Sequence, residues 1–166
     1  MVFDTSEGTV QGFDSNRCDV LTSDTSQLAA LRTQLSDPAS AGILPEIISK
    51  EPLGPVVRQG DDAWFNVVKW VLNGQINAEE YGVSSANLDE MLQSTDPNVQ
   101  RIVGTDGNMG EILGLDGDFM VNVISQVGNY AEMFERNVGV NTPLGLSRGA
   151  NALWTDGGIL YAPPFR

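Results

Sequence analysis

Strand-like and helix-like patterns are divided unevenly along this chain, and this division restricts its fold more than any other feature. Three short apolar runs typical of β-strands all lie before residue 59. They are Cys18–Leu21, Ile43–Ile48 and Leu53–Arg58. Pro45 and Pro55 interrupt the last two runs, and proline in a strand is confined to sheet edges, strand starts and bulges. The first run therefore reads as a buried strand, and the other two read as edge or crossing strands.

The remaining apolar residues recur at helical spacing. Between the first two runs they predict a helix that begins near Asp24 and ends at Asp37-Pro38, which gives a βαβ unit. From Asp61 onward they predict about four helices. Asp61 can cap the first of these, and Gly74 weakens its end. Ser84 or Ser85 can cap the next, Asp96-Pro97 begins another, and the last spans residues 119–134 with Gly139 just past its end.

This pattern predicts an α/β fold class with strands missing. About three short strands are a poor platform for so many helices, because a sheet must cover the apolar face of each helix that packs on it. Unpaired sheet edges and exposed apolar surface would favour self-association into a homo-oligomer.

The composition excludes several functions. The net charge of −13, from 9 basic and 22 acidic residues, repels phosphate backbones and anionic lipid, so it argues against nucleic acid and membrane surfaces as partners. The chain has no His and a single Cys, Cys18, which leaves no zinc-ligand pattern and no His-based catalytic triad. Asp106–Glu111 lacks the glycine and glutamate spacing of a calcium loop. We therefore predict no metal, no cofactor and no enzymatic activity.

Asp24 is the candidate ligand-binding residue. It follows the first apolar run, where a predicted strand gives way to a predicted helix. In open α/β sheets ligands bind outside the carboxyl ends of the strands, and a carboxylate there can pair with an ammonium group. Aspartate is also a preferred helix N-cap. The residues alone leave both roles open and favour the cap.

Two groups of aromatic residues point to packing surfaces. Phe65 and Trp70 fall off the main apolar stripe of the helix after Asp61, a stripe that includes Trp64, and we expect them to face another domain or subunit. The tail Tyr161–Phe165 places two aromatic residues around two prolines, so we expect it to be ordered and packed.

Five segments resemble one protein family. Arg17–Asp24 resembles the second-lobe motif of polar amino-acid-binding proteins, and Leu44–Pro55 is similar to the segment that returns to lobe one. The others resemble the C-terminal signature of the general L-amino-acid-binding subgroup: Asn141–Leu146, Asn151–Gly158 and Tyr161–Arg166. The chain thus resembles the C-terminal half of a periplasmic substrate-binding protein of an amino-acid ABC transporter.

The resemblance implies a partial type II periplasmic-binding-protein fold, an incomplete lobe two plus the C-terminal helical part of lobe one. Residues 1–49 would belong to lobe two, 50–60 to the hinge, and 61–166 to lobe one with a helical extension. Asp24 would pair with the α-ammonium group of the ligand. Cys18 matches a cysteine whose partner is absent, so it should be a free thiol.

The arginine that grips the ligand carboxylate in the family has no counterpart, so we expect L-amino acid binding to be weak or lost in this chain. The function implied is that of a truncated solute-binding protein, which in the family works with a membrane permease. The alternative is a structural protein, a truncated paralogue that self-associates and no longer binds amino acids. The family is periplasmic, but no leader-like stretch follows Met1, so a natural start there would place the chain in the cytoplasm.

Overall fold

The computed structural model describes residues 2–49 and 52–166, and it divides the chain into two compact units. The first unit is Met1–Leu53 with Val138–Ser147, and the second is Gly54–Asn137 with Arg148–Arg166. Lys50 and Glu51, which open the predicted hinge at residues 50–60, lie outside the described residues. The assignment of the two parts to lobes of a larger protein stays a prediction.

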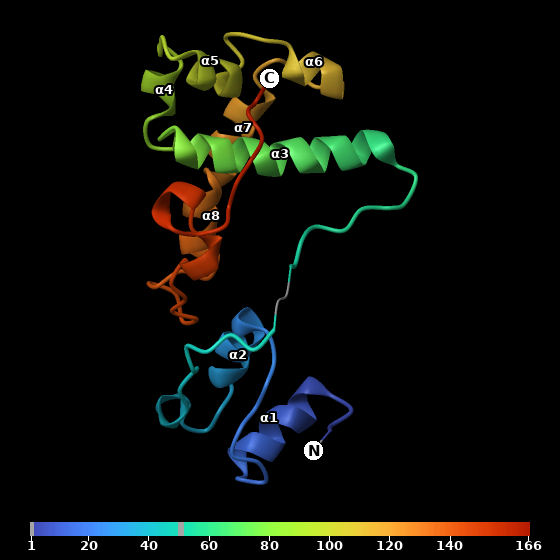
Figure 1. Cartoon of the computed structure of the whole chain (residues 1–166), viewed down its shortest axis with the longest axis vertical. Helices are drawn as coiled ribbons and strands as arrows, with labels where there is room; N and C mark the ends of the chain where they lie inside the picture. Colours follow the sequence, from blue (N-terminus) through green and yellow to red (C-terminus); the bar gives the residue numbers. More distant parts are fainter. Residues whose placement is uncertain (1, 50–51) are drawn as a thin grey trace. The chain divides into compact units, whose positions relative to one another are not determined.

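The described residues of the first unit form two short helices, α1 (Ser6–Asp14) and α2 (Thr25–Arg32), and one 3₁₀ turn, η1 (Pro38–Ser40) (Figure 1). Asp14 at the end of α1 accepts hydrogen bonds from the backbone N–H and the hydroxyl of Ser36, at 3.0 and 2.5 Å, and so ties α1 to the loop after α2. The described part of the first unit has few buried hydrophobic residues: Val10, Ala29 and Leu31. The helix predicted at Asp24 is confirmed, although it ends at Arg32 rather than at Asp37-Pro38.

The second unit is built on the long helix α3 (Asp62–Glu80). Two further helices, α7 (Phe119–Val127) and α8 (Tyr130–Asn137), pack against it. In Figure 1, α4 to α6 lie along one side of α3 and α8 lies on the other. The bounds of the smaller helices are α4 Leu88–Met91, α5 Pro97–Val103, α6 Met109–Leu113, η2 Gly149–Asn151 and η3 Trp154–Asp156.

Local signals placed the starts of two of these helices correctly. The side chain of Asp61 accepts a hydrogen bond from the backbone N–H of Trp64 at 3.1 Å, and that of Asp96 accepts one from Asn98 at 2.8 Å. Gly74, in contrast, does not end α3. A side chain there would collide with Met120, whose Cε and Sδ lie 2.7 Å from the position of a Cβ atom. Gly74 is therefore a site of close packing between α3 and α7.

The long helix predicted for residues 119–134 is two helices, and this prediction was wrong. Gly128 adopts a positive φ of 81° and ends α7. Asn129 then begins α8 with a capping box: its Oδ1 accepts from the N–H of Glu132 at 3.0 Å, and Glu132 accepts from the N–H of Asn129 at 2.9 Å. The amide nitrogen of Asn129 also donates to the carbonyl of Val83 at 2.9 Å. These bonds account for the change in direction.

The predicted strands are not formed. Across residues 2–49 and 52–166 no β-strand occurs, and the runs Cys18–Leu21, Ile43–Ile48 and Leu53–Arg58 have neither helical nor strand structure. An isolated parallel bridge joins Leu153 and Leu160. A strand requires a second strand to satisfy its backbone, and these runs do not pair with one another, so the α/β class is not confirmed in the described part of the chain. The described helices include none that is long and apolar enough to cross a membrane.

Candidate functional site

Asp24 caps helix α2. Its Oδ1 accepts hydrogen bonds from the backbone N–H of Gln27 at 2.8 Å and from the hydroxyl of Ser26 at 2.9 Å. These two bonds, the one from Gln27 first, hold the pKa of the Asp24 carboxyl below its ordinary value of 3.8. The capping role that the sequence favoured is thus present, and the carboxylate is ionised at neutral pH.

The side chain of Asp24 is also within reach of a ligand. Asp24 is half-buried, its two flanking residues are exposed, and both of the bonds described above end on one carboxylate oxygen. Arg17, the basic residue nearest to it in the sequence, has its guanidinium 5.6 Å from the centre of the Phe3 ring. The geometry therefore presents a negative charge suited to an ammonium group, with no arginine shown beside it to hold a carboxylate.

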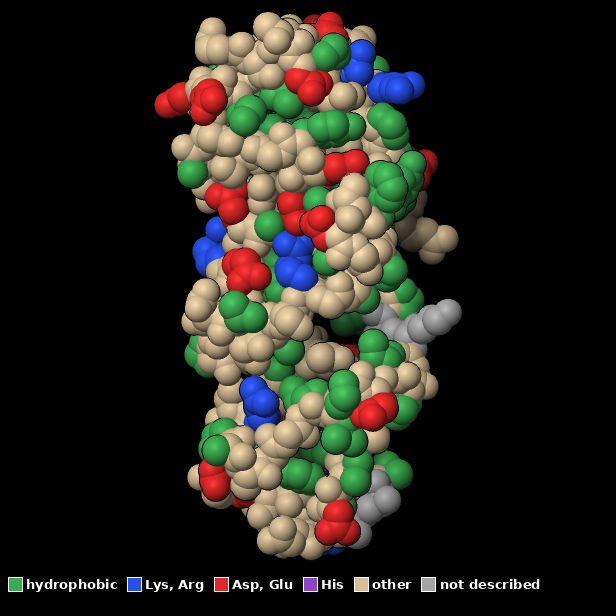
Figure 2. All heavy atoms as spheres, turned by 60° about the vertical axis from the view of Figure 1, so that its left-hand side comes forward, with side chains coloured by type: hydrophobic (Ala, Val, Ile, Leu, Met, Phe, Trp, Pro, Cys, Tyr) green, Lys and Arg blue, Asp and Glu red, His purple; other side chains and the backbone are tan. Residues whose placement is uncertain are grey.

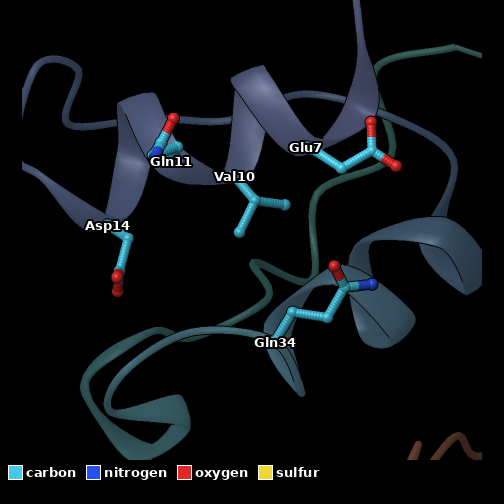
Figure 3. Close-up of a pocket in the computed structure, with 5 residues that line it drawn as sticks. All are labelled: Glu7, Val10, Gln11, Asp14 and Gln34. Atoms are coloured by element: carbon cyan, nitrogen blue, oxygen red, sulfur yellow. The ribbon is translucent and has the colours of Figure 1, made fainter.

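A shallow cavity of about 260 Å³, widely open to solvent, lies in the first unit beside α1. Figure 3 shows Val10 and Asp14 on the side of α1 that faces Gln34, while Gln11 lies on the upper side of the helix. Two carboxylates, from Glu7 and Asp14, line this cavity without a basic residue, and Asp14 is already bonded to Ser36. An amino acid carries a carboxylate, so this cavity is poorly suited to one, and Asp24 does not line it.

Asp106–Asn108 lie in the turn between α5 and α6, and Met109–Glu111 form the start of α6. Asp106 lies 3.7 Å from the Nε of Arg101, and Gly107 has a positive φ of 84°. Within the described ranges no three or more His, Cys, Asp or Glu side chains gather closely enough to hold a metal ion.

The two tryptophans of α3, Trp64 and Trp70, take positions opposite to those predicted, whereas Phe65 lies off the buried face as predicted. Trp70 packs against the core and meets Phe165 edge-on, with ring centroids 5.7 Å apart. Trp64, which was placed on the inward stripe, is 54% exposed, and Phe65 is 47% exposed. The C-terminal tail was expected to be packed, and its Phe165 is buried among core residues. Figure 2 shows hydrophobic side chains on the displayed surface, interspersed with acidic ones.

A cluster around Arg148 was missed by sequence reasoning. Its Nη2 donates to both carboxylate oxygens of Glu79, at 2.9 and 3.0 Å, and its guanidinium lies 5.4 and 5.3 Å from the ring centres of Tyr130 and Phe134. Burial raises the pKa of Glu79 above its ordinary value of 4.5, against the opposing effect of Arg148, and burial likewise raises the pKa of Tyr130. The spacing of Tyr130 and Phe134 by four residues was the available signal. The cluster joins α3, α8 and the C-terminal segment, and it is structural.

The chain is similar to known solute-binding proteins of amino-acid transporters. No protein-family model matches the sequence. The chain is 53% identical over 156 residues to the general L-amino acid-binding periplasmic protein AapJ of Rhizobium johnstonii, covering 93% of this chain and 46% of that protein. It is 51% identical over 166 residues to the glutamate/glutamine/aspartate/asparagine-binding protein BztA of Rhodobacter capsulatus, covering 99% of this chain and 49% of that protein.

A solved structure gives the same result. An ABC transporter periplasmic binding protein from Brucella ovis, with glutathione bound, is 48% identical and superposes with a TM-score of 0.93, covering 100% of this chain and 52% of that one. The resemblance is therefore confirmed: the homologues of this chain are amino-acid ABC transporter periplasmic binding proteins. The chain spans about half the length of the curated relatives it matches.

Proposed function

We propose that this chain forms one part of a solute-binding protein that delivers L-amino acids to an ABC importer in the periplasm. The supporting observation is that 93% of this chain matches about half of AapJ and 99% of it matches about half of BztA, and both of those proteins are named as amino-acid-binding proteins. In this proposal residues 1–49 belong to lobe two and residues 61–166 to lobe one of a partial type II fold, and the membrane permease is the downstream partner.

Asp24 is the proposed ligand contact. Its carboxylate is ionised, half-buried and fixed by the N-terminus of α2, so pairing with an α-ammonium group would need little rearrangement. The carboxylate end of the ligand needs a basic partner, and among the described residues none is shown beside Asp24. Burying a charge without a partner is costly, and binding by this chain alone is therefore impaired.

The ligand class has a second candidate, glutathione, which is bound in the Brucella ovis structure. The glutamyl end of glutathione carries a free α-ammonium and a free α-carboxylate, as an amino acid does. Asp24 would therefore meet the same ammonium group in either ligand. What differs is the length of the side chain that the remainder of the site must accommodate.

A chimaera tests the role of Asp24. In it, this chain replaces the matched part of the Brucella ovis protein, and calorimetry measures binding of L-glutamate, L-glutamine, L-aspartate, L-asparagine and glutathione. Asp24→Asn keeps a good N-cap but removes the charge. We expect its affinity to fall at least about 30-fold, because removing one partner of a hydrogen-bonded charge pair costs about 2–5 kcal/mol.

The matched control is Asp37→Asn, since Asp37 also caps a short helix of the first unit, through a 3.1 Å bond to the N–H of Ala39. Unchanged affinity in Asp24→Asn would leave Asp24 with the capping role alone. Micromolar binding by the unfused chain would contradict the proposed impairment.

The alternative function is that of a structural protein that self-associates. It is favoured by large aliphatic side chains at the surface, among them Ile47, Ile48 and Val56, which are 79%, 82% and 95% exposed. Light scattering on the chain distinguishes the two. A stable homo-oligomer that binds no amino acid, even as the chimaera, would support the structural role over the transport role.

A further inference from the structure

We propose that a cavity of the second unit binds a small organic carboxylate. The cavity has a volume of about 220 Å³ and is partly open to solvent. It lies between the last turn of α5, the turn before α6 and the tail residues Phe165 and Arg166. Asp24 belongs to the first unit, so this site is separate from the proposed ligand contact and does not depend on the proposed function.

The charge of the cavity is opposite in sign to that of the chain. Two arginines, Arg101 and Arg166, line it together with one carboxylate, that of Asp106. Two positive charges and one negative charge leave the cavity positive, in a chain whose net charge is −13. The two guanidinium groups repel each other, and an anion bound beside them would relieve this repulsion. The expected ligand is therefore an anion.

The side chains of this cavity have hydrogen-bond donors to spare. The Nε of Arg101 lies 3.7 Å from the Oδ2 of Asp106, which is longer than a hydrogen bond. The guanidinium of Arg166 and the side-chain amide of Asn108 make no hydrogen bond or ion pair with any described residue. A guanidinium presents its donors in a planar fork that matches the two oxygens of a carboxylate. The cavity thus offers the donors that a carboxylate requires.

The tail side of the cavity is held in place by the core. Phe165 is 5% exposed, and its ring meets that of Trp70 edge-on at 5.7 Å between centroids. The amide nitrogen of Asn77 donates to the carbonyl of Pro163 at 2.9 Å. These contacts bring Arg166 beside α5 and α6, where Figure 1 marks the end of the chain. Because the backbone is already positioned, binding has to order little besides side chains.

The cavity also has an apolar side. Met109 and Phe165 line it along with the charged residues. Sites for drug-sized ligands measure about 300–1,000 Å³, so this smaller cavity suits a short molecule. A carboxylate with a short hydrocarbon chain would use both the arginines and the apolar side, whereas an inorganic anion would use the arginines alone.

Nuclear magnetic resonance titration of the whole chain tests the proposal. Butyrate is the probe, and butylammonium is the control, because it has a similar hydrocarbon body and the opposite charge. We expect butyrate to cause saturable shifts of the backbone amide signals of residues 101–109, and butylammonium to cause none. Acetate should bind more weakly than butyrate, since it lacks most of the hydrocarbon. No saturable shift with butyrate, or equal shifts with butylammonium, would overturn the proposal.

Substitutions of opposite expected effect identify the charges involved. Arg101→Gln and Arg166→Gln should each weaken butyrate binding at least about threefold, because each removes a charged donor. Asp106→Asn should strengthen it at least about twofold, because it removes the negative charge beside Arg101. The control is Arg58→Gln, which makes the same change of charge at an exposed arginine of the second unit outside the cavity.

The gain expected in Asp106→Asn protects the test from a trivial explanation. A variant that failed to fold would lose affinity, so a gain cannot arise from unfolding. A loss in Arg58→Gln as large as that in Arg101→Gln would show that butyrate responds only to the overall charge of the protein. That result, or unchanged or weaker binding by Asp106→Asn, would contradict a carboxylate site in this cavity.

Discussion

Replacing Arg148 by alanine should destabilise the second unit more than any other single loss of charge in that unit. Arg148 donates to both oxygens of Glu79, and its Nε and Nη2 donate to the carbonyl of Asn151 at 3.0 and 2.9 Å. The Glu79 side chain is only 12% exposed. Without Arg148 it becomes a buried carboxylate with no cation beside it.

The expected cost is about 3 kcal/mol, the lower end of the range for removing one partner of a buried ion pair, because the Arg148 side chain is still 19% exposed. The two ring contacts add about 0.5 kcal/mol each at such a site. The total is about 4 kcal/mol, and with a urea slope of about 1.5 kcal/mol per molar the midpoint of unfolding should fall by roughly 2.7 M.

Tryptophan fluorescence is the appropriate assay, since Trp64, Trp70 and Trp154 all belong to the second unit. Arg58→Ala is the control, because Arg58 is exposed and its removal changes the net charge equally. It should alter stability by less than about 0.5 kcal/mol. A loss in Arg148→Ala no larger than that of Arg58→Ala would refute the reasoning.

Three further predictions concern the second unit. Met120→Ala should cost about 2–5 kcal/mol in urea unfolding, because Met120 is fully buried against α3. Gly104→Ala should cost at least about 1 kcal/mol in the same assay, since φ is 76° and the new methyl would overlap the Gly117 carbonyl. Burial raises the pKa of Glu79, so its protonated form favours folding; this contribution is present below the ordinary value of 4.5 and is lost as pH rises through the folded-state pKa. The melting temperature of the original chain should therefore fall as the pH rises from 4.5, and it should fall less in Glu79→Gln, which cannot ionise at this position. Melting curves measured across pH 4 to 7 would show the difference.

The features that the sequence predicted well are local ones. Asp24, Asp61 and Asp96 each cap a helix, because a cap needs only a side chain and an N–H group two or three residues further on. The capping box of Asn129 and Glu132 was equally readable, but the apolar spacing that continues from Phe119 to Phe134 concealed it.

Long-range features could not be read from spacing. Trp64 and Trp70 lie on one helix, and which of them is buried depends on where Phe165 returns to pack, almost a hundred residues later. Arg148 and Glu79 are also distant, 69 residues apart in the sequence. The role of Asp24 as a ligand contact was suggested by its position after an apolar run, and it remains a prediction, because an N-cap and an ammonium site call for the same residue at the same place.

The missing strands bear on how the first unit is stabilised. An apolar run of residues indicates that burial of its side chains is favourable, but a strand forms only when another strand supplies hydrogen bonds. The second unit has a core of its own around Ile102, Met120 and Ile124. The described part of the first unit buries little beyond Val10, Ala29 and Leu31, while Ile47 and Ile48 stay exposed. So small a core is marginal for a body of this length, and covering the exposed runs is the most direct way for it to gain apolar burial.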